Sequence, residues 1–168
     1  VVMALLRQLV YQAGVDPQDI VLYDVTRYFP DALAVPIQSE FPTVQLVDWQ
    51  GEEGRQRYQR DEECPVRWSQ ELILEKDGGN PTYVPTCASQ ADYLINLTNL
   101  KGHSLAGITL GAKNFFGSIC ADRNGQPASS APQGAGLHPY VAVHDFSLGN
   151  PVWESFERPM GTYNPLVD

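Results

Sequence analysis

The first half of the chain alternates between helical and strand-like patterns of apolar residues. Apolar side chains recur at spacings of three and four residues over 2–10, which predicts an amphipathic helix, and Gly14 follows as its stop. Short apolar runs predict buried strands at 20–24 and 44–48, with a weakly helical stretch between them. This order predicts an α/β fold whose mostly parallel sheet is flanked by helices.

The pattern changes over residues 51–84. Residues 51–64 are densely charged, which predicts a solvated surface excursion with exposed arginines (Arg55, Arg57 and Arg60). An Asp-Gly-Gly-Asn sequence farther along is a strong turn signal, with strand-like residues on both sides of it. We therefore expect a β-hairpin or loop insertion near 51–84 in the α/β layer.

Two further elements are predicted in the second half. Apolar residues make 93–97 the best candidate for a central strand, and helix-like spacing follows over 105–119. A helix that starts at Leu105 places Lys113 far from His103. A helix that starts near Thr109 makes this threonine the N-cap and leaves free backbone N–H groups beside Lys113. We favour the second start.

Composition limits the classes of function. The 168 residues, of which 43% are hydrophobic and 18% charged, fit a single α/β domain over 1–168. A formal charge of −9 argues against a broad nucleic-acid or membrane-surface footprint but leaves room for a small basic site. No apolar run reaches the roughly 18 residues of a membrane span. The three cysteines are widely spaced without a CxxC motif, so we assign no metal site and favour free or buried thiols.

The candidate chemistry is concentrated in residues 96–117. This segment holds two of the three lysines in the chain, Lys101 and Lys113, with His103 between them. No acidic residue occurs over 93–121, although the whole chain is acidic. A locally positive, glycine-rich loop that follows a strand predicts an anion-binding site.

We therefore predict a site for one carboxylate or phosphate at the carboxyl end of the 93–97 strand. His103 and Lys113 are the candidate catalytic residues, because histidine titrates near neutral pH and lysine pairs with anions. The other predicted anion-binding residues are Asn96, Lys101, Thr109, Gly111 and Asn114. We expect all of these groups around one concavity.

A structural interpretation of the same residues stays open. Gly107 and Gly111 would then serve close helix packing, Lys113 would be a solvated helix lysine, and His103 a satisfied loop histidine. Asp24, expected at the end of a neighbouring strand, would supply a carboxylate between the cations. The cluster would in that case be a buried ion pair, which is weak evidence for either stability or function.

The run from Asn96 to Gly117, with the pattern Leu-Lys-x-His followed by Thr-x-x-x-Lys-Asn-x-x-Gly, resembles the domain-of-unknown-function family 362. The opening helix and strand up to Asp24 and the closing residues 163–168 are similar to other parts of that domain. The resemblance implies that the chain is a trimmed piece of a longer family domain. Some members carry ferredoxin-type iron–sulfur modules or a twin-arginine export signal. Since Val1 is not a start residue, a removed leader and an exported location stay open.

The stretch from His103 to Lys113 is also similar to one of nickel-pincer lactate racemases, His-x-x-Ala-Gly-x-Ser-Gly-Gly-x-Lys. The histidine-to-lysine separation is the same, but Thr109 and Leu110 replace the serine and the first glycine. In that family the histidine is a catalytic acid/base and the lysine holds the cofactor. The resemblance implies a shared fold, and it does not extend to the cofactor. The cofactor of this chain stays unassigned, and no cysteine motif supports a cluster.

Two classes of function follow from these observations. The first is a small-anion-binding α/β domain, and whether its His/Lys site catalyses a reaction is left open. The second is a non-catalytic partner or scaffold module linked to iron–sulfur or exported redox proteins. Such a module would use the 51–80 region or an exposed sheet edge for self-association or for contact with a partner chain.

Overall fold

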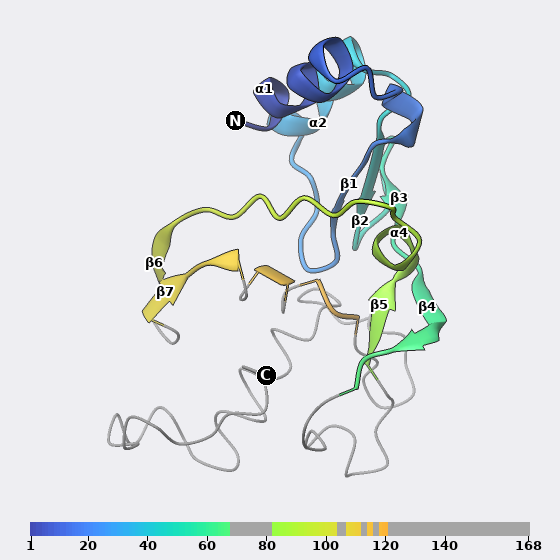
Figure 1. Ribbon diagram of the computed structural model, residues 1–168, viewed down its shortest axis with the longest axis vertical. Coiled ribbons are helices and arrows are strands. Elements are labelled where there is room, and N and C mark those ends of the chain that lie inside the picture. The colour runs from blue at the N-terminus through green and yellow to red at the C-terminus, as the bar shows by residue number, and fades with distance from the viewer. Residues whose placement is uncertain (68–81, 104–106, 112–113, 116–117, 121–168) are drawn as a thin grey trace.

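The computed structural model describes residues 1–67, 82–103, 107–111, 114–115 and 118–120 (Figure 1). They form a three-stranded parallel sheet, two antiparallel strand pairs and a few short helices. The predicted α/β class is therefore confirmed. That all 168 residues form a single domain stays a prediction.

The chain opens with helix α1 (Val2–Arg7), which continues into a wider π-helical turn (Gln8–Gln12). The helical segment ends at Gly14, whose φ of 74° is readily adopted only by glycine. The helix and its stop were both predictable from the sequence. Leu6 of α1 is 1% exposed and anchors the helix in the core.

The parallel sheet has the order β1 (Val21–Asp24), β2 (Gln45–Asp48) and β3 (Gln56–Arg57). Helix α2 (Asp31–Glu40) connects the first two strands, whose register runs from Val21 opposite Gln45 to Asp24 opposite Asp48. The strands predicted at 20–24 and 44–48 are thus confirmed. α1 and α2 lie together at one end of the described structure (Figure 1).

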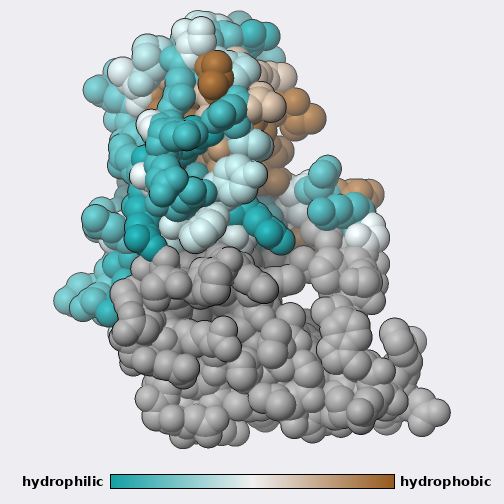
Figure 2. Space-filling view, turned by 180° about the vertical axis from the view of Figure 1, so that it is seen from behind, coloured by the Kyte–Doolittle hydropathy of each residue, from teal (hydrophilic) through white to brown (hydrophobic). Residues whose placement is uncertain are grey.

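Two groups of buried apolar side chains hold these elements together. The first joins α1, α2 and the sheet and consists of Leu6, Ile20, Ala34, Ile37, Phe41, Val44 and Leu46. The second consists of Val25, Val47, Tyr58 and Cys120. Each large side chain in such a group stabilises the fold by about 1.5–3 kcal/mol. From behind, the described surface is mostly hydrophilic, with apolar residues gathered along one side (Figure 2).

Strand β4 (Arg60–Pro65) pairs antiparallel with β5 (Tyr83–Pro85), which runs into the short helix α4 (Thr86–Ser89). This pair confirms the expected hairpin near 51–84, although its turn lies outside the described residues. The prediction that 51–64 forms a solvated surface excursion is confirmed in part, because most of these residues are exposed, but the segment also contributes β3 and β4 to the sheets and buries Tyr58.

The exposure of the arginines was predicted only in part. Arg57 is exposed, whereas the Arg60 side chain is 34% exposed and that of Arg55 only 6%. The charge density of the segment predicts exposed arginines. The guanidinium of Arg55 can be buried because it donates to a carbonyl and a carboxylate of the protein in place of water.

The strand predicted at 93–97 is not present. These residues are irregular and unpaired, with Tyr93 91% and Ile95 55% exposed. An apolar run predicts a strand only where a neighbouring strand accepts its hydrogen bonds, and none of the described strands does so here.

The predicted helix start at Leu105 is wrong, because residues 107–109 form a strand, whereas the predicted start near Thr109 is one residue too early. Strand β6 (Lys101–His103) pairs antiparallel with β7 (Gly107–Thr109), so the region begins as a hairpin. A helical turn follows, in which the Asn114 N–H donates to the Leu110 carbonyl at 3.2 Å. Leu110, and not Thr109, therefore precedes the first helical residue. None of the helices within the described residues has the length and apolar character needed to cross a membrane.

Candidate functional site

The β6–β7 hairpin carries several of the predicted site residues. Its register places Lys101 opposite Thr109 and His103 opposite Gly107. Lys101, at the open end of the hairpin, is exposed to solvent. A strand pair of three residues is marginally stable by itself, so contacts outside the ladder are needed to hold it.

The Asn96 side chain connects the chain segments on either side of this hairpin. Its Nδ2 donates to the Gly111 carbonyl at 2.9 Å. Its Oδ1 accepts from the Thr98 hydroxyl at 2.6 Å and from Nδ2 of Asn114 at 2.7 Å. The structure therefore brings together Asn96, Gly111 and Asn114, three of the residues that the sequence singled out.

Thr98 was missed by the sequence analysis. Asn and Thr separated by one residue often form local side-chain hydrogen bonds, and that spacing was the available signal. Gly111 has a role different from the expected one, which was to let a ligand approach the backbone. A Cβ at this position would lie 3.2 Å from Nδ2 of Asn96, so the glycine makes room for the asparagine amide.

Lys101 and Asp24 are not joined in the described part of the structure. Asp24 Oδ1 accepts from the Thr26 N–H at 2.9 Å, the Thr26 hydroxyl at 2.8 Å and the Arg27 N–H at 3.1 Å. The carboxylate thus closes the turn after β1, as an aspartate at a strand end commonly does. An ion pair of Asp24 with Lys113 or His103 lies outside what is described, since Lys113 is not described and only the backbone of His103 is.

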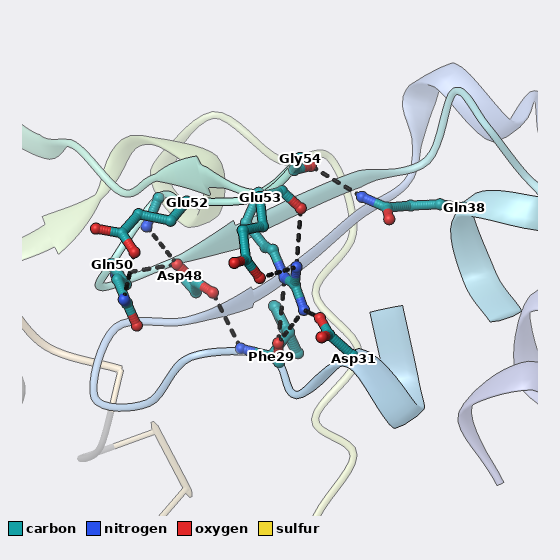
Figure 3. A network of polar contacts seen from close by, with 10 residues as sticks. Phe29, Asp31, Gln38, Asp48, Gln50, Glu52, Glu53 and Gly54 are labelled. Carbon is teal, nitrogen blue, oxygen red and sulfur yellow. Dashed lines mark hydrogen bonds and ion pairs between the residues drawn. The ribbon is translucent and has the colours of Figure 1, made fainter. Parts of the chain in front are cut away.

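The carboxyl edge of the parallel sheet holds a second polar group of residues (Figure 3). Asp48, the register partner of Asp24, is 1% exposed. It accepts from the backbone N–H groups of Phe29 at 3.0 Å, Gln50 at 3.0 Å and Gly51 at 2.7 Å. One buried carboxylate therefore binds the loop after β1 and the loop after β2.

Arg55 binds the peptide segment at Phe29 from the side opposite Asp48, and the two residues with their partners form a polar frame. Its Nε and Nη2 donate to the Phe29 carbonyl at 3.1 and 2.6 Å, and Nη2 also pairs with Asp31. Nη1 donates to the Glu53 carbonyl at 2.8 Å. Ligands of open α/β sheets bind beside this edge. Here the polar groups are engaged with one another, so the frame fixes the loops that border such a position.

Cys87 and Cys120 do not have the properties of reactive thiols. Burial raises the pKa of Cys87 to about 11 and that of Cys120 to about 12, so both are neutral thiols near pH 7. Burial likewise raises the pKa of Tyr23, opposed by its hydrogen bond with Ser118. Among the described residues, no three His, Cys, Asp or Glu side chains are grouped so as to hold a metal ion.

Comparison with known proteins gives one match. A family model described as a domain of unknown function (DUF362) matches residues 67–167, which includes the β6–β7 hairpin and the Asn96 contacts. The match does not include the opening helix and the parallel sheet. No curated protein and no solved structure is significantly similar to the chain.

Proposed function

The chain belongs to the DUF362 family of domains of unknown function, and from this premise we propose that it binds a small anion, a carboxylate or a phosphate, beside the β6–β7 hairpin. The observation that carries the proposal is the fastening of the Lys101-bearing hairpin by Asn96 within a stretch that lacks acidic residues. Family membership by itself assigns no activity.

Charge and position support this function. Lys101 is exposed at the open end of the hairpin and lies across from Thr109. Its ammonium group therefore remains available to a ligand, and a lysine binds phosphate or carboxylate as a point charge. In a chain of charge −9, a locally positive loop attracts anions that the rest of the surface repels.

The proposal assigns the remaining roles from the sequence. Lys113 is the second cation, and His103 is an acid/base if the bound anion reacts. The similarity to the nickel-pincer racemase stretch supports the acid/base role of His103, whereas the role of Lys113 rests on its charge. Asn96, Thr109, Gly111 and Asn114 form or shape the anion site, and no cofactor is assigned.

A thermal-shift titration with inorganic phosphate and with acetate, at ionic strength held constant with chloride, tests the proposal. A ligand at 100 times its Kd stabilises the folded state by about 2.7 kcal/mol, which raises Tm. We expect Lys101→Ala and Lys113→Ala to abolish this rise. The control is Lys76→Ala, which makes the same charge change at the lysine outside the segment. Equal shifts in all three variants and the wild type would refute the site.

A second candidate function, a partner module, is favoured by one specific observation. The apolar side chains of segment 93–100 are exposed, at 91% for Tyr93, 45% for Leu94, 55% for Ile95, 44% for Leu97 and 74% for Leu100, and none of the described strands pairs with the segment. Contiguous exposed apolar residues are typical of protein-interaction sites, and an extended segment pairs readily with another strand.

The oligomeric state tests this second candidate. For a module that self-associates through 93–100, sedimentation should show a concentration-dependent dimer that Ile95→Lys weakens. Val35→Lys is the matched control, because Val35 is also exposed, at 57%, but lies on α2. A wild-type chain that stays monomeric, or a dimer that both variants weaken equally, would count against self-association through this segment.

A further inference from the structure

Within the described residues, the Asn96 side chain fastens the β6–β7 hairpin at its open end. The ladder is three residues long on each strand and ends with Lys101 opposite Thr109. Beyond this pair the two chain segments leave the ladder. Asn96 and Gly111 then meet across 15 positions of sequence through the 2.9 Å hydrogen bond from Nδ2 to the carbonyl.

The chemistry of this contact requires an asparagine. Nδ2 must donate to the Gly111 carbonyl, while Oδ1 must accept from both Thr98 and Asn114. Aspartate has the same shape but donates no hydrogen bond at neutral pH, so two acceptors would face each other. Alanine would remove all three contacts.

The segment that follows β7 leaves room for the Asn96 amide. Gly111 leaves the space that a Cβ would restrict, at 3.2 Å from Nδ2 of Asn96. Asn114 is held by its own N–H, which donates to the Leu110 carbonyl at 3.2 Å. The asparagine amide therefore joins the irregular segment that leads to Lys101 with the helical turn that follows β7.

We propose that Asn96 is a positioning residue: its amide keeps the β6–β7 hairpin closed and so fixes where Lys101 stands relative to the turn at Gly111. Its effect on anion affinity rests on the proposed function, whereas closure of the hairpin does not. The polar groups of Asn96 are engaged within the protein, so it acts on the ligand through the place it gives to Lys101.

The experiment compares Asn96→Asp with Asn99→Asp in the whole chain. Both substitutions add one negative charge within three residues of each other, and Asn99 is an exposed residue. General repulsion of an anion is therefore nearly the same in the two variants. Hydrogen exchange of the amides at 101–103 and 107–111 is followed by NMR without ligand, and inorganic phosphate is then titrated.

We expect Asn96→Asp to speed exchange of the hairpin amides about fivefold, because the variant loses the stability of about one net hydrogen bond. Asn99→Asp should leave the exchange rates unchanged. Phosphate affinity should fall further in Asn96→Asp than in Asn99→Asp. If Asn96→Asp fails to fold, Asn114→Ala removes one of the three contacts and should speed exchange in the same direction by a smaller factor.

Each outcome decides a different statement. Equal exchange in the two aspartate variants overturns the positioning role, whether or not phosphate binds. Faster exchange together with no phosphate binding by the wild type supports the closure by Asn96 and refutes the anion site. Faster exchange with affinities equal in the two variants overturns the claim that Asn96 positions Lys101 for an anion.

Discussion

Replacing Asp48 by asparagine probes the frame at the carboxyl edge of the parallel sheet. The amide keeps one oxygen, which can still accept from Gln50 and Gly51 as Oδ1 does now. Its NH₂ group then replaces Oδ2 and faces the Phe29 N–H, which loses its acceptor. The same substitution at Asp24 is the matched control, because these two residues are register partners.

The expected effects differ because the two carboxylates distribute their hydrogen bonds differently. All the bonds that Asp24 accepts from Thr26 and Arg27 reach Oδ1, so an asparagine there can keep each of them. Asp48 uses both oxygens, and no orientation of an amide satisfies both sides. A hydrogen bond to a charged group contributes about 1.5–3 kcal/mol, so Asp48→Asn should destabilise by about 2 kcal/mol more than Asp24→Asn.

Urea unfolding followed by circular dichroism measures this difference. With a slope of about 2 kcal/mol per molar urea, the midpoint of Asp48→Asn should fall about 1 M below that of Asp24→Asn. Loss of negative charge is common to both variants and cancels in the comparison. The reasoning is refuted if Asp24→Asn is destabilised as much as Asp48→Asn, or if neither midpoint moves.

Three further predictions concern other parts of the chain. Burial raises the pKa of Cys87 to about 11 and of Cys120 to about 12 from an ordinary value near 9. The folded state therefore favours neutral thiols, and this contribution to stability is complete below about pH 9 and lost as the pH rises through 11–12. Unfolding free energies measured against pH should show this loss, and Cys87→Ala should reduce it; an unchanged pH dependence would contradict the assignment. Pro36→Ala should raise Tm, with a gain of about 2 kcal/mol, because this exposed proline interrupts the hydrogen bonds of α2; a lower Tm in a thermal melt would mean that the interruption is needed for packing. Gly111→Ala should speed hydrogen exchange in the β6–β7 hairpin, because its Cβ would press on Nδ2 of Asn96, and slower exchange would disprove the contact.

The sequence predicted those elements whose partners are close along the chain. β1 and β2 are short apolar runs joined by one helix, and this local arrangement is enough to specify a parallel pair. Residues 93–97 have the same apolar character, but the pattern contains no information about which strand would pair with them. The β6–β7 hairpin was missed because glycines at 102 and 107 interrupt any alternation and the connection between the strands has no Gly, Pro, Asn or Asp to mark a turn.

The candidate site was predictable as a group of residues but not as a set of contacts. Local charge and glycine spacing singled out Asn96, Gly111 and Asn114, which meet in the structure through hydrogen bonds. That Asn96 binds the protein itself follows from a contact across 15 residues, which no local pattern encodes. The burial of Arg55 was unpredictable for the same reason, since its acceptors come from Phe29 and Asp31. Anion binding itself stays a prediction.

The peptide segment at Phe29 is held on both faces, by Asp48 at its N–H and by Arg55 at its carbonyl. Opening either of the loops after β1 and β2 therefore breaks hydrogen bonds that hold the other loop. The two loops form one cooperative unit, in which local unfolding should occur in a single step. Arg55 also reaches Asp31 in the first turn of α2, so a strain applied to the loop after β2 is passed directly to the start of that helix.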